Sequence, residues 1–266
     1  MLREITLGQY YPVDSVLHRM DPRTKLLGTL LFIISLFCAN SWLGYLTAAV
    51  FLAITIRLSR VPFRFMVRGL KAILILLLIS VSFNLFLTSG EVVWQLGILK
   101  ITREGIRTAI FMALRLIFLV IGSSVMTLTT TPNELTDGLE KGLGFLNKVG
   151  VPVHEVAMMM SIALRFIPIL IEEADKIMKA QMARGADFES GNLIQRAKSM
   201  VPLLVPLFIS AFRRATDLAM AMEARCYHGG EGRTKMKPLC YRKRDRIAQV
   251  ILAGYLCLII GTRFIA

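Results

Sequence analysis

Two arginines, Arg184 and Arg225, stand at the ends of segments that repeat each other 41 positions apart. The alanines before them match as well: Ala174, Ala180 and Ala183 correspond to Ala215, Ala221 and Ala224. Alanine keeps a helix intact and lets another backbone approach closely, and a guanidinium can donate several hydrogen bonds to a partner. The pattern is compatible with a pair of docking tips. It is equally compatible with two cations stabilised by the dipole at helix C-termini.

Residues that could carry out catalysis are few. Glu172 and Glu173 could serve an intramembrane metalloprotease, but Asp175 and Lys176 follow them at once, and the sequence has no HExxH pattern among His18, His154 and His228. No CxxC pair occurs among Cys38, Cys226, Cys240 and Cys257. The sequence also lacks a GxxxxGK[ST] phosphate-binding loop, so any ATP must be bound by another chain. We therefore expect no catalytic residue, no metal site and no cofactor.

Composition indicates a membrane protein. Of the 266 residues, 55% are hydrophobic, and 32 Lys and Arg against 18 Asp and Glu give a net charge of +14. The mean hydropathy of +0.60 is too high for an ordinary soluble enzyme. The basic residues flank uncharged runs, which is typical of membrane topology. The basic stretch 233–246 precedes the last such run, so we assign it to anionic lipid headgroups and expect no nucleic-acid partner.

Uncharged runs at 26–56, 72–90, 116–133 and 247–262 are candidate membrane spans. The first is long enough for two short helices joined at Asn40-Ser41-Trp42, and Asp21 with Pro22 can begin the first of them. This hairpin places 27 of the 32 basic residues on one side of the membrane. The sequence therefore predicts five spans, with a cytoplasmic N-terminus and an external C-terminus.

The stretch between the last two spans predicts two long helices, at 153–184 and 193–225, after a shorter helix at 133–148. Each long helix is apolar in its first half and charged in its second. The uncharged stretch 199–212 would rise only about 21 Å as a helix, less than a bilayer core of about 30 Å. We therefore expect a cytosolic domain at 132–242, between a membrane domain at 1–131 and the last transmembrane helix at 243–266. The predicted fold class is an all-α polytopic membrane protein with about five transmembrane helices, two long crossed cytosolic helices and one short helix.

The apolar halves of the long helices have two interpretations. They could be buried core or re-entrant segments, or they could form an apolar platform at the membrane interface for another membrane protein. Methionine-rich surfaces repack against varied partners, which slightly favours the platform. The methionines concerned are Met158, Met159, Met160, Met178, Met182, Met220 and Met222.

Several motifs, in this order along the chain, resemble the transmembrane (T) component of energy-coupling factor transporters. They are Asp14-Ser15-Val16-Leu17-His18-Arg19-Met20-Asp21-Pro22-Arg23-Thr24-Lys25, Arg165-Phe166-Ile167-Pro168, Ala183-Arg184-Gly185 and Ala224-Arg225. The resemblance covers essentially the whole chain. One departure is Cys226, which stands where a second Ala-Arg-Gly motif would have glycine.

The resemblance implies a non-catalytic scaffold and energy-coupling subunit of an ABC-type importer in the bacterial cell membrane. Two cytosolic ABC-type ATPase subunits would bind its helix ends, at Ala183, Arg184 and Gly185 and at Ala224 and Arg225. A separate substrate-specific membrane subunit, the S component, would dock on the apolar faces and release its vitamin or metal ion inside. The platform residues implied are Met159, Ile162, Phe166, Pro168, Leu203, Val205 and Phe208.

Two other functions remain as alternatives. An intramembrane enzyme is disfavoured by the solvated setting of Glu172 and Glu173. A self-contained secondary transporter would need polar features deep in its spans, where only Asn84 and Arg115 are candidates. Overall likeness favours a shared vitamin module over a dedicated metal-ion system, although the substrate itself is specified by another chain.

Overall fold

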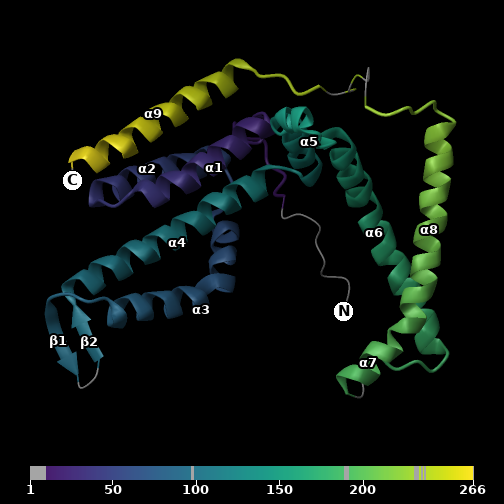
Figure 1. Cartoon of the computed structure of the whole chain (residues 1–266), viewed down its shortest axis with the longest axis horizontal. Coiled ribbons are helices and arrows are strands. Elements are labelled where there is room, and N and C mark those ends of the chain that lie inside the picture. Colours follow the sequence, from purple (N-terminus) through teal and green to yellow (C-terminus); the bar gives the residue numbers. More distant parts are fainter. Residues whose placement is uncertain are drawn as a thin grey trace. The chain divides into compact units, whose positions relative to one another are not determined.

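A computed structural model describes residues 10–96, 99–188, 192–230, 234, 236 and 238–265. The chain divides into two compact units. The bundle unit is the described part of Gly8–Gly138 together with Leu239–Ala266, and the long-helix unit is the described part of Leu139–Pro238. Figure 1 labels the elements along the chain.

The bundle unit begins with a helical hairpin, α1 (Pro22–Cys38) and α2 (Trp42–Ser59). Asp21 caps α1 by accepting a hydrogen bond from the Arg23 amide at 2.9 Å, and Pro22 occupies the first turn, where a missing N–H costs nothing. Ser41 caps α2 by accepting from the Gly44 amide at 3.2 Å. The predicted division of the first apolar run at Asn40-Ser41-Trp42 is therefore confirmed.

The remaining bundle elements are α3 (Phe63–Leu87), β1 (Val92–Leu96), β2 (Leu99–Thr102), α4 (Arg103–Thr129), α5 (Pro132–Gly142), which runs on into the long-helix unit, and α9 (Lys243–Ile265). β1 and β2 pair antiparallel, an element that the sequence analysis did not predict. α3 bends by 62° between Lys71 and Ile73. α4 ends at Thr129, three residues before Pro132, because the residue before a proline disfavours the helical conformation.

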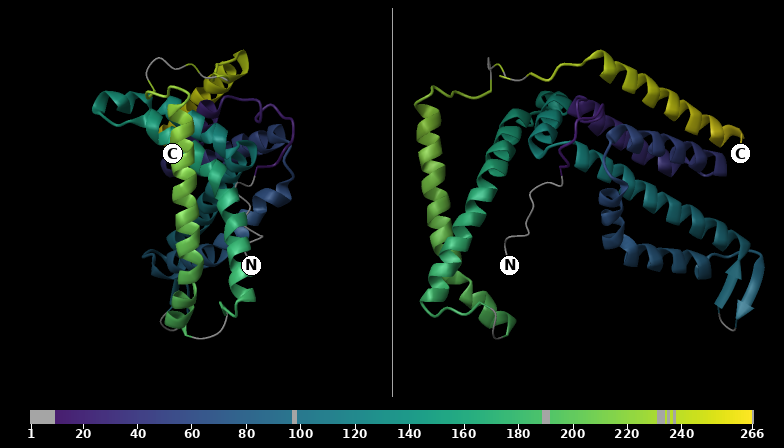
Figure 2. Two further views of the ribbon diagram at one scale, coloured as in Figure 1. Left: turned by 90° about the vertical axis from the view of Figure 1, so that its right-hand side faces the viewer. Right: turned by 180° about the vertical axis from the view of Figure 1, so that it is seen from behind.

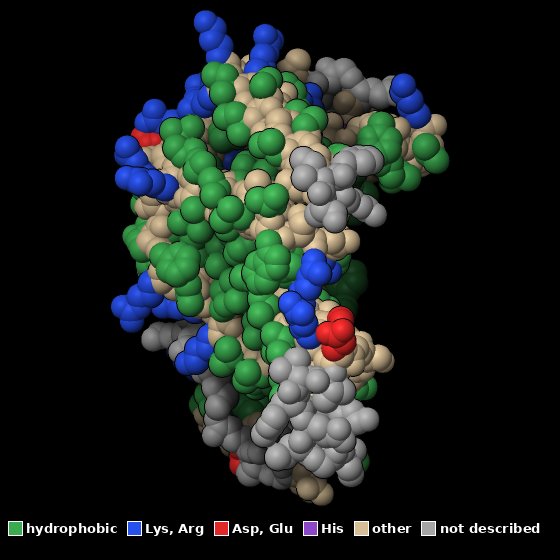
Figure 3. Space-filling view, turned by 90° about the vertical axis from the view of Figure 1, so that its left-hand side faces the viewer, with side chains coloured by type: hydrophobic (Ala, Val, Ile, Leu, Met, Phe, Trp, Pro, Cys, Tyr) green, Lys and Arg blue, Asp and Glu red, His purple; other side chains and the backbone are tan. Residues whose placement is uncertain are grey.

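The core of the bundle unit lies among α1, α2, α4, α9 and the first part of α3. The Phe51 and Tyr255 rings stack at 4.2 Å, and the Tyr255 hydroxyl lies 2.8 Å from the Ser35 hydroxyl. A Cβ at Gly122 would lie 2.5 Å from the Phe32 ring, so α1 and α4 pack this closely only because Gly122 has no side chain. Much of the described surface outside this core is also apolar. Figure 3 shows a face with a broad expanse of hydrophobic side chains and most Lys and Arg at its margins.

The long-helix unit contains a 3-10 turn (Gly144–Val149) and the helices α6 (Val153–Ala183), α7 (Leu193–Ser199) and α8 (Val201–Glu223). Two predictions differ from this arrangement. The short helix expected at 133–148 is divided into α5 and the 3-10 turn, and the helix expected at 193–225 breaks at Met200. The break has a steric cause, because Pro202 in the first turn of α8 lacks an N–H and clashes with a preceding helical turn.

By length and hydropathy, four described helices can cross a membrane: α2, α4, α6 and the Lys243–Thr262 part of α9. The bent α3 makes a fifth if its two parts form one span. The fold is therefore an all-α polytopic membrane protein apart from one hairpin, as predicted. The set of helices differs from the predicted one, because α6 qualifies and α1, with 17 residues, is short. The predicted domain limits stay a prediction.

Candidate functional site

The candidate site is built on α6 and α8, which contact each other toward the C-terminal end of α6 and diverge away from that end (Figures 1 and 2). Near the middle of each helix, Glu173 accepts hydrogen bonds from the Ser210 hydroxyl at 2.5 Å and from the Arg214 guanidinium at 2.6 Å. Further along α6, the side-chain Nε2 of Gln181 donates a hydrogen bond to the Pro202 carbonyl at 3.4 Å, near the start of α8. The helices are therefore antiparallel, and their C-terminal ends lie at opposite ends of the pair.

Both helices end in the same hydrogen-bonded turn. At the end of α6, the Gly185 amide donates to the Met182 carbonyl and the Ala186 amide to the Gln181 carbonyl, each at 3.0 Å. At the end of α8, the Cys226 amide donates to the Glu223 carbonyl at 2.8 Å, and the Tyr227 amide donates to the Met222 carbonyl at 3.1 Å. These pairs are the two bonds of a Schellman motif. The repeat 41 positions apart is thus a repeat of backbone geometry as well as of residue type.

The departure at Cys226 does not change this geometry. Gly185 has φ +88° and Cys226 has φ +55°, so both lie in the left-handed region. Glycine adopts this region at no steric cost, whereas a residue with a Cβ is strained there. The second motif therefore lacks the glycine but keeps the turn that the glycine would provide.

Each predicted helix-end residue is exposed: Ala183, Arg184, Gly185, Ala224 and Arg225. Because α6 and α8 are antiparallel, Arg184 and Arg225 lie at opposite ends of the helix pair, each within its own turn. Two well-separated cationic tips can contact two different partners at once, or two copies of one partner.

The predicted platform residues divide by exposure. Met159 is 57% exposed, Val205 53% and Phe208 64%, and Pro168 is also exposed. Ile162 and Phe166 are half-buried, whereas Leu203 is 7% exposed. Leu203 therefore packs inside the unit and is not available on the open face.

An open apolar groove of about 320 Å³ runs along α8, lined by Leu204, Val205, Phe208, Ile209 and Phe212. The Phe208 and Phe212 rings lie 5.7 Å apart. Three of these residues, Leu204, Ile209 and Phe212, were missed by the sequence analysis. Their spacing could have identified them, because residues four apart share one face of a helix.

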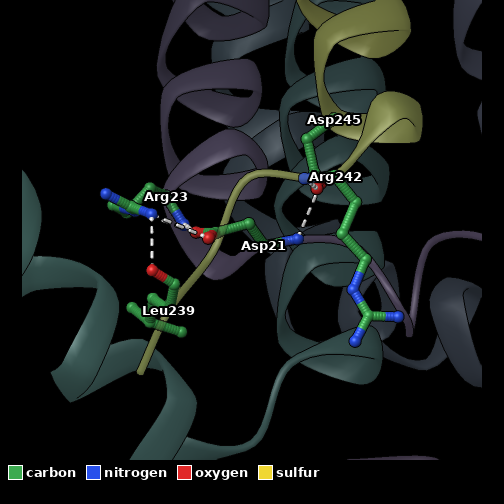
Figure 4. Close-up of polar contacts among 5 residues, drawn as sticks. All are labelled: Asp21, Arg23, Leu239, Arg242 and Asp245. Atoms are coloured by element: carbon green, nitrogen blue, oxygen red, sulfur yellow. Dashed lines mark hydrogen bonds and ion pairs between the residues drawn. The ribbon is translucent and has the colours of Figure 1, made fainter. Parts of the chain in front are cut away.

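A second set of polar contacts joins the start of α1 to the start of α9 within the bundle unit (Figure 4). The Asp245 carboxylate, 1% exposed, accepts from the Asp21 amide and from the Arg242 amide, both at 2.8 Å. Arg23 holds the Asp21 carboxylate at 2.9 and 3.0 Å, donates to the Leu239 carbonyl at 3.4 Å, and lies 4.0 Å above the Tyr241 ring. We call these contacts the Asp245 joint.

The electrostatics of the Asp245 joint favour a charged Asp21 carboxylate. Burial alone would raise the pKa of Asp21, but hydrogen bonds from Arg23 and the charges of Arg23 and Lys25 outweigh it, so this pKa is below its usual value. Lys25, 7% exposed, donates to the Thr129 carbonyl at the end of α4 at 2.8 Å. The Asp14–Lys25 motif therefore fixes helix ends within the bundle.

Glu173 and His154 each pair with another side chain of the long-helix unit. Among the described residues, no group of three or more His, Cys, Asp or Glu side chains could hold a metal ion. Glu173, the carboxylate that could have suggested an enzyme, is engaged by Ser210 and Arg214. His154 pairs with Glu140 at 2.9 Å, within the long-helix unit.

Comparison with known proteins gives a consistent result. The model of the CbiQ family, described as cobalt transport protein, matches residues 14–236. The energy-coupling factor transporter transmembrane protein EcfT of Clostridium kluyveri is 56% identical over 99% of this chain and 98% of its own. The protein of the same name from Thermosediminibacter oceani is 56% identical over 99% and 100%, and that from Bacillus subtilis 47% over 96% and 98%. This chain therefore belongs to the CbiQ family, as the transmembrane component of an energy-coupling factor transporter.

Proposed function

We propose that this chain is the scaffold that couples two ABC-type ATPases to a substrate-specific S component in an ATP-driven importer. The ATPases bind one helix end each, at Arg184 and at Arg225. The S component docks on the exposed apolar face of the two helices. Movement of the ATPases is passed along α6 and α8 to the S component, which releases its vitamin on the cytoplasmic side.

The observation that carries this proposal is the duplicated helix end. Two exposed arginines lie within matching Schellman turns, at opposite ends of an antiparallel pair. A guanidinium at such a tip can bind a carboxylate or the carbonyls of a partner helix with several donors. The arrangement suits two ATPases that lie next to each other beneath one membrane subunit.

The apolar face supports the second half of the proposal. Phe208, Ile209 and Phe212 are each more than half exposed along one side of α8. A contiguous exposed apolar surface is typical of a contact with lipid or with another protein. The N-terminus and both arginine tips lie on the cytoplasmic side in this proposal, where the ATPases are.

The proposal predicts that Arg184→Ala and Arg225→Ala each lower ATP-driven uptake at least about tenfold, because one charged contact of this kind contributes about 1.5–3 kcal/mol. The double variant should be inactive and should no longer co-purify with ATPases. Uptake is measured in cells that carry all subunits, with labelled vitamin in one arm and labelled Co²⁺ in the other, because the matching family is described as a cobalt transporter.

Arg165→Ala and Arg213→Ala are matched controls, since both arginines are exposed on the same two helices but away from the tips. These variants should transport normally, and all variants should reach the membrane in equal amounts. Normal uptake by the double tip variant would remove the proposed coupling role.

A further inference from the structure

Arginines of α4 lie on an aromatic surface in the bundle unit. Arg107, Phe111 and Arg115 are four residues apart, so they share one face of the helix. Arg115 Nε donates to the Tyr45 hydroxyl at 3.2 Å, and its guanidinium lies 5.3 Å from the centre of the Phe37 ring. The Arg107 guanidinium lies 5.4 Å from the centre of the Phe111 ring.

The aromatic residues around these arginines contact one another and differ in exposure, with Tyr45 buried and Phe37 and Trp42 exposed. Phe111 stacks on Tyr45 at 4.9 Å and meets the Trp42 ring edge-on at 4.9 Å. Tyr45 is only 3% exposed, whereas Trp42 is 56% and Phe37 58% exposed. A molecule that approaches from the surrounding lipid would therefore touch Phe37, Trp42 and the two guanidinium groups.

The position of these residues along α1 and α2 gives the depth of the cluster. Phe37 is the next-to-last residue of α1, and Tyr45 lies in the first turn of α2. The aromatic residues therefore lie at the closed end of the α1–α2 hairpin, where both spans end. Arg115 lies nearer the middle of α4 and reaches this end through its hydrogen bond to Tyr45. Amphipathic aromatic residues gather at that depth, next to lipid headgroups.

The charge of the cluster is not balanced by protein. Among the described residues, neither Arg107 nor Arg115 forms an ion pair with an acidic side chain. Arg107 is exposed and Arg115 half-buried. A cation among apolar and aromatic groups at the edge of a bilayer requires a counter-ion or water.

We propose that Arg107, Arg115 and the aromatic residues Phe37, Trp42 and Tyr45 bind the headgroup of an anionic phospholipid. The phosphodiester lies between the two guanidinium groups, which match phosphate geometry, and the acyl chains run along the exposed rings of Phe37 and Trp42. A lipid with net negative charge is favoured over a zwitterionic one, because an ammonium headgroup would be repelled by the second arginine.

The sequence contains two tryptophans, Trp42 and Trp94, so Trp94→Phe leaves Trp42 as the only indole reporter. In this background, the full chain is placed in vesicles of unlabelled phosphatidylcholine containing dibrominated phosphatidylglycerol or dibrominated phosphatidylcholine. The dibrominated phosphatidylglycerol should quench Trp42 fluorescence at a several-fold lower mole fraction than the dibrominated phosphatidylcholine. Soluble glycerol phosphate at millimolar concentration should not displace the anionic lipid, because glycerol phosphate lacks acyl chains.

Arg107→Gln and Arg115→Gln should each reduce the preference for the anionic lipid by about fivefold, and the double variant should show none. Arg57→Gln, in the last turn of α2 and so at the opposite end from Trp42, removes the same charge and should keep the preference. Equal quenching by the two lipids in the parent chain would overturn the proposal. An unchanged preference in a correctly inserted double variant would overturn it as well.

Discussion

Cys226 occupies a backbone conformation that suits glycine. Its φ of +55° is held by the same pair of turn hydrogen bonds that surrounds Gly185. The left-handed region costs a residue with a Cβ about 1–2 kcal/mol, partly offset because glycine is freer in the unfolded chain. We therefore predict that Cys226→Gly stabilises the chain by roughly 0.5–1 kcal/mol, measured as a higher Tm in detergent.

The reciprocal change, Gly185→Ala, should lower the Tm, because Gly185 has φ +88° and open space around a Cβ. The loss would then come from backbone strain and not from a clash. Cys257→Gly, in the interior of α9, is a control that should destabilise, since glycine weakens a helix interior. A lower Tm for Cys226→Gly would show that its side chain contributes more than the strain costs.

At the scale of elements, the Asp245 joint fixes where α9 starts relative to α1. Its carboxylate accepts hydrogen bonds from two backbone amides: that of Asp21, which is buried, and that of Arg242, which is partly buried. An unsatisfied buried donor costs about 1–3 kcal/mol. We predict that Asp245→Ala destabilises the bundle by about 2–4 kcal/mol, seen as a large fall in Tm.

Asp217→Ala, at an exposed position of α8, removes an acidic residue of the same type and should change the free energy of unfolding by no more than about 0.5 kcal/mol, so that the Tm stays near that of the parent. The Tm of Asp245→Asn should lie between those of Asp245→Ala and Asp217→Ala, because the asparagine side chain keeps one oxygen acceptor. A Tm for Asp245→Ala equal to that of the control would mean that water replaces the carboxylate at this joint.

At the scale of the whole molecule, the assignment of α6 decides the topology. Its 31 residues are long and apolar enough to span a bilayer, yet the distribution of basic residues predicts that both its ends are cytoplasmic. In a chain whose native cysteines are replaced, single cysteines at Val151 and Ala183 flank α6 at exposed positions. We predict that an impermeant maleimide labels neither in intact cells and both in inverted vesicles.

Ser89→Cys is the topological control, since it lies between α3 and β1 and should be labelled from outside. Labelling at Val151 and Ala183 from opposite sides would make α6 a true span. The Arg184 and Arg225 tips could then not both face cytosolic ATPases, and the proposed function would fail with this result.

Local sequence determined the helices and many of their ends. Asp21-Pro22 and Ser41 begin α1 and α2 where expected, because capping and proline geometry depend on neighbouring residues alone. The start of α6 at Val153 and the matching turns after Arg184 and Arg225 follow from local signals in the same way. The break at Met200 also follows from a local signal, Pro202, which stands inside a longer apolar pattern that by itself indicates one continuous helix.

Only the tertiary structure decided which distant groups meet. Asp245 lies 224 residues from Asp21, and Arg115 lies 70 residues from Tyr45, so no spacing in the sequence indicates either contact. Which apolar residues stay exposed was equally undetermined, because Leu203 and Leu204 are the same residue type and only one is buried. Capping and periodicity act over a few residues, whereas burial and polar pairing depend on how complete helices pack against each other.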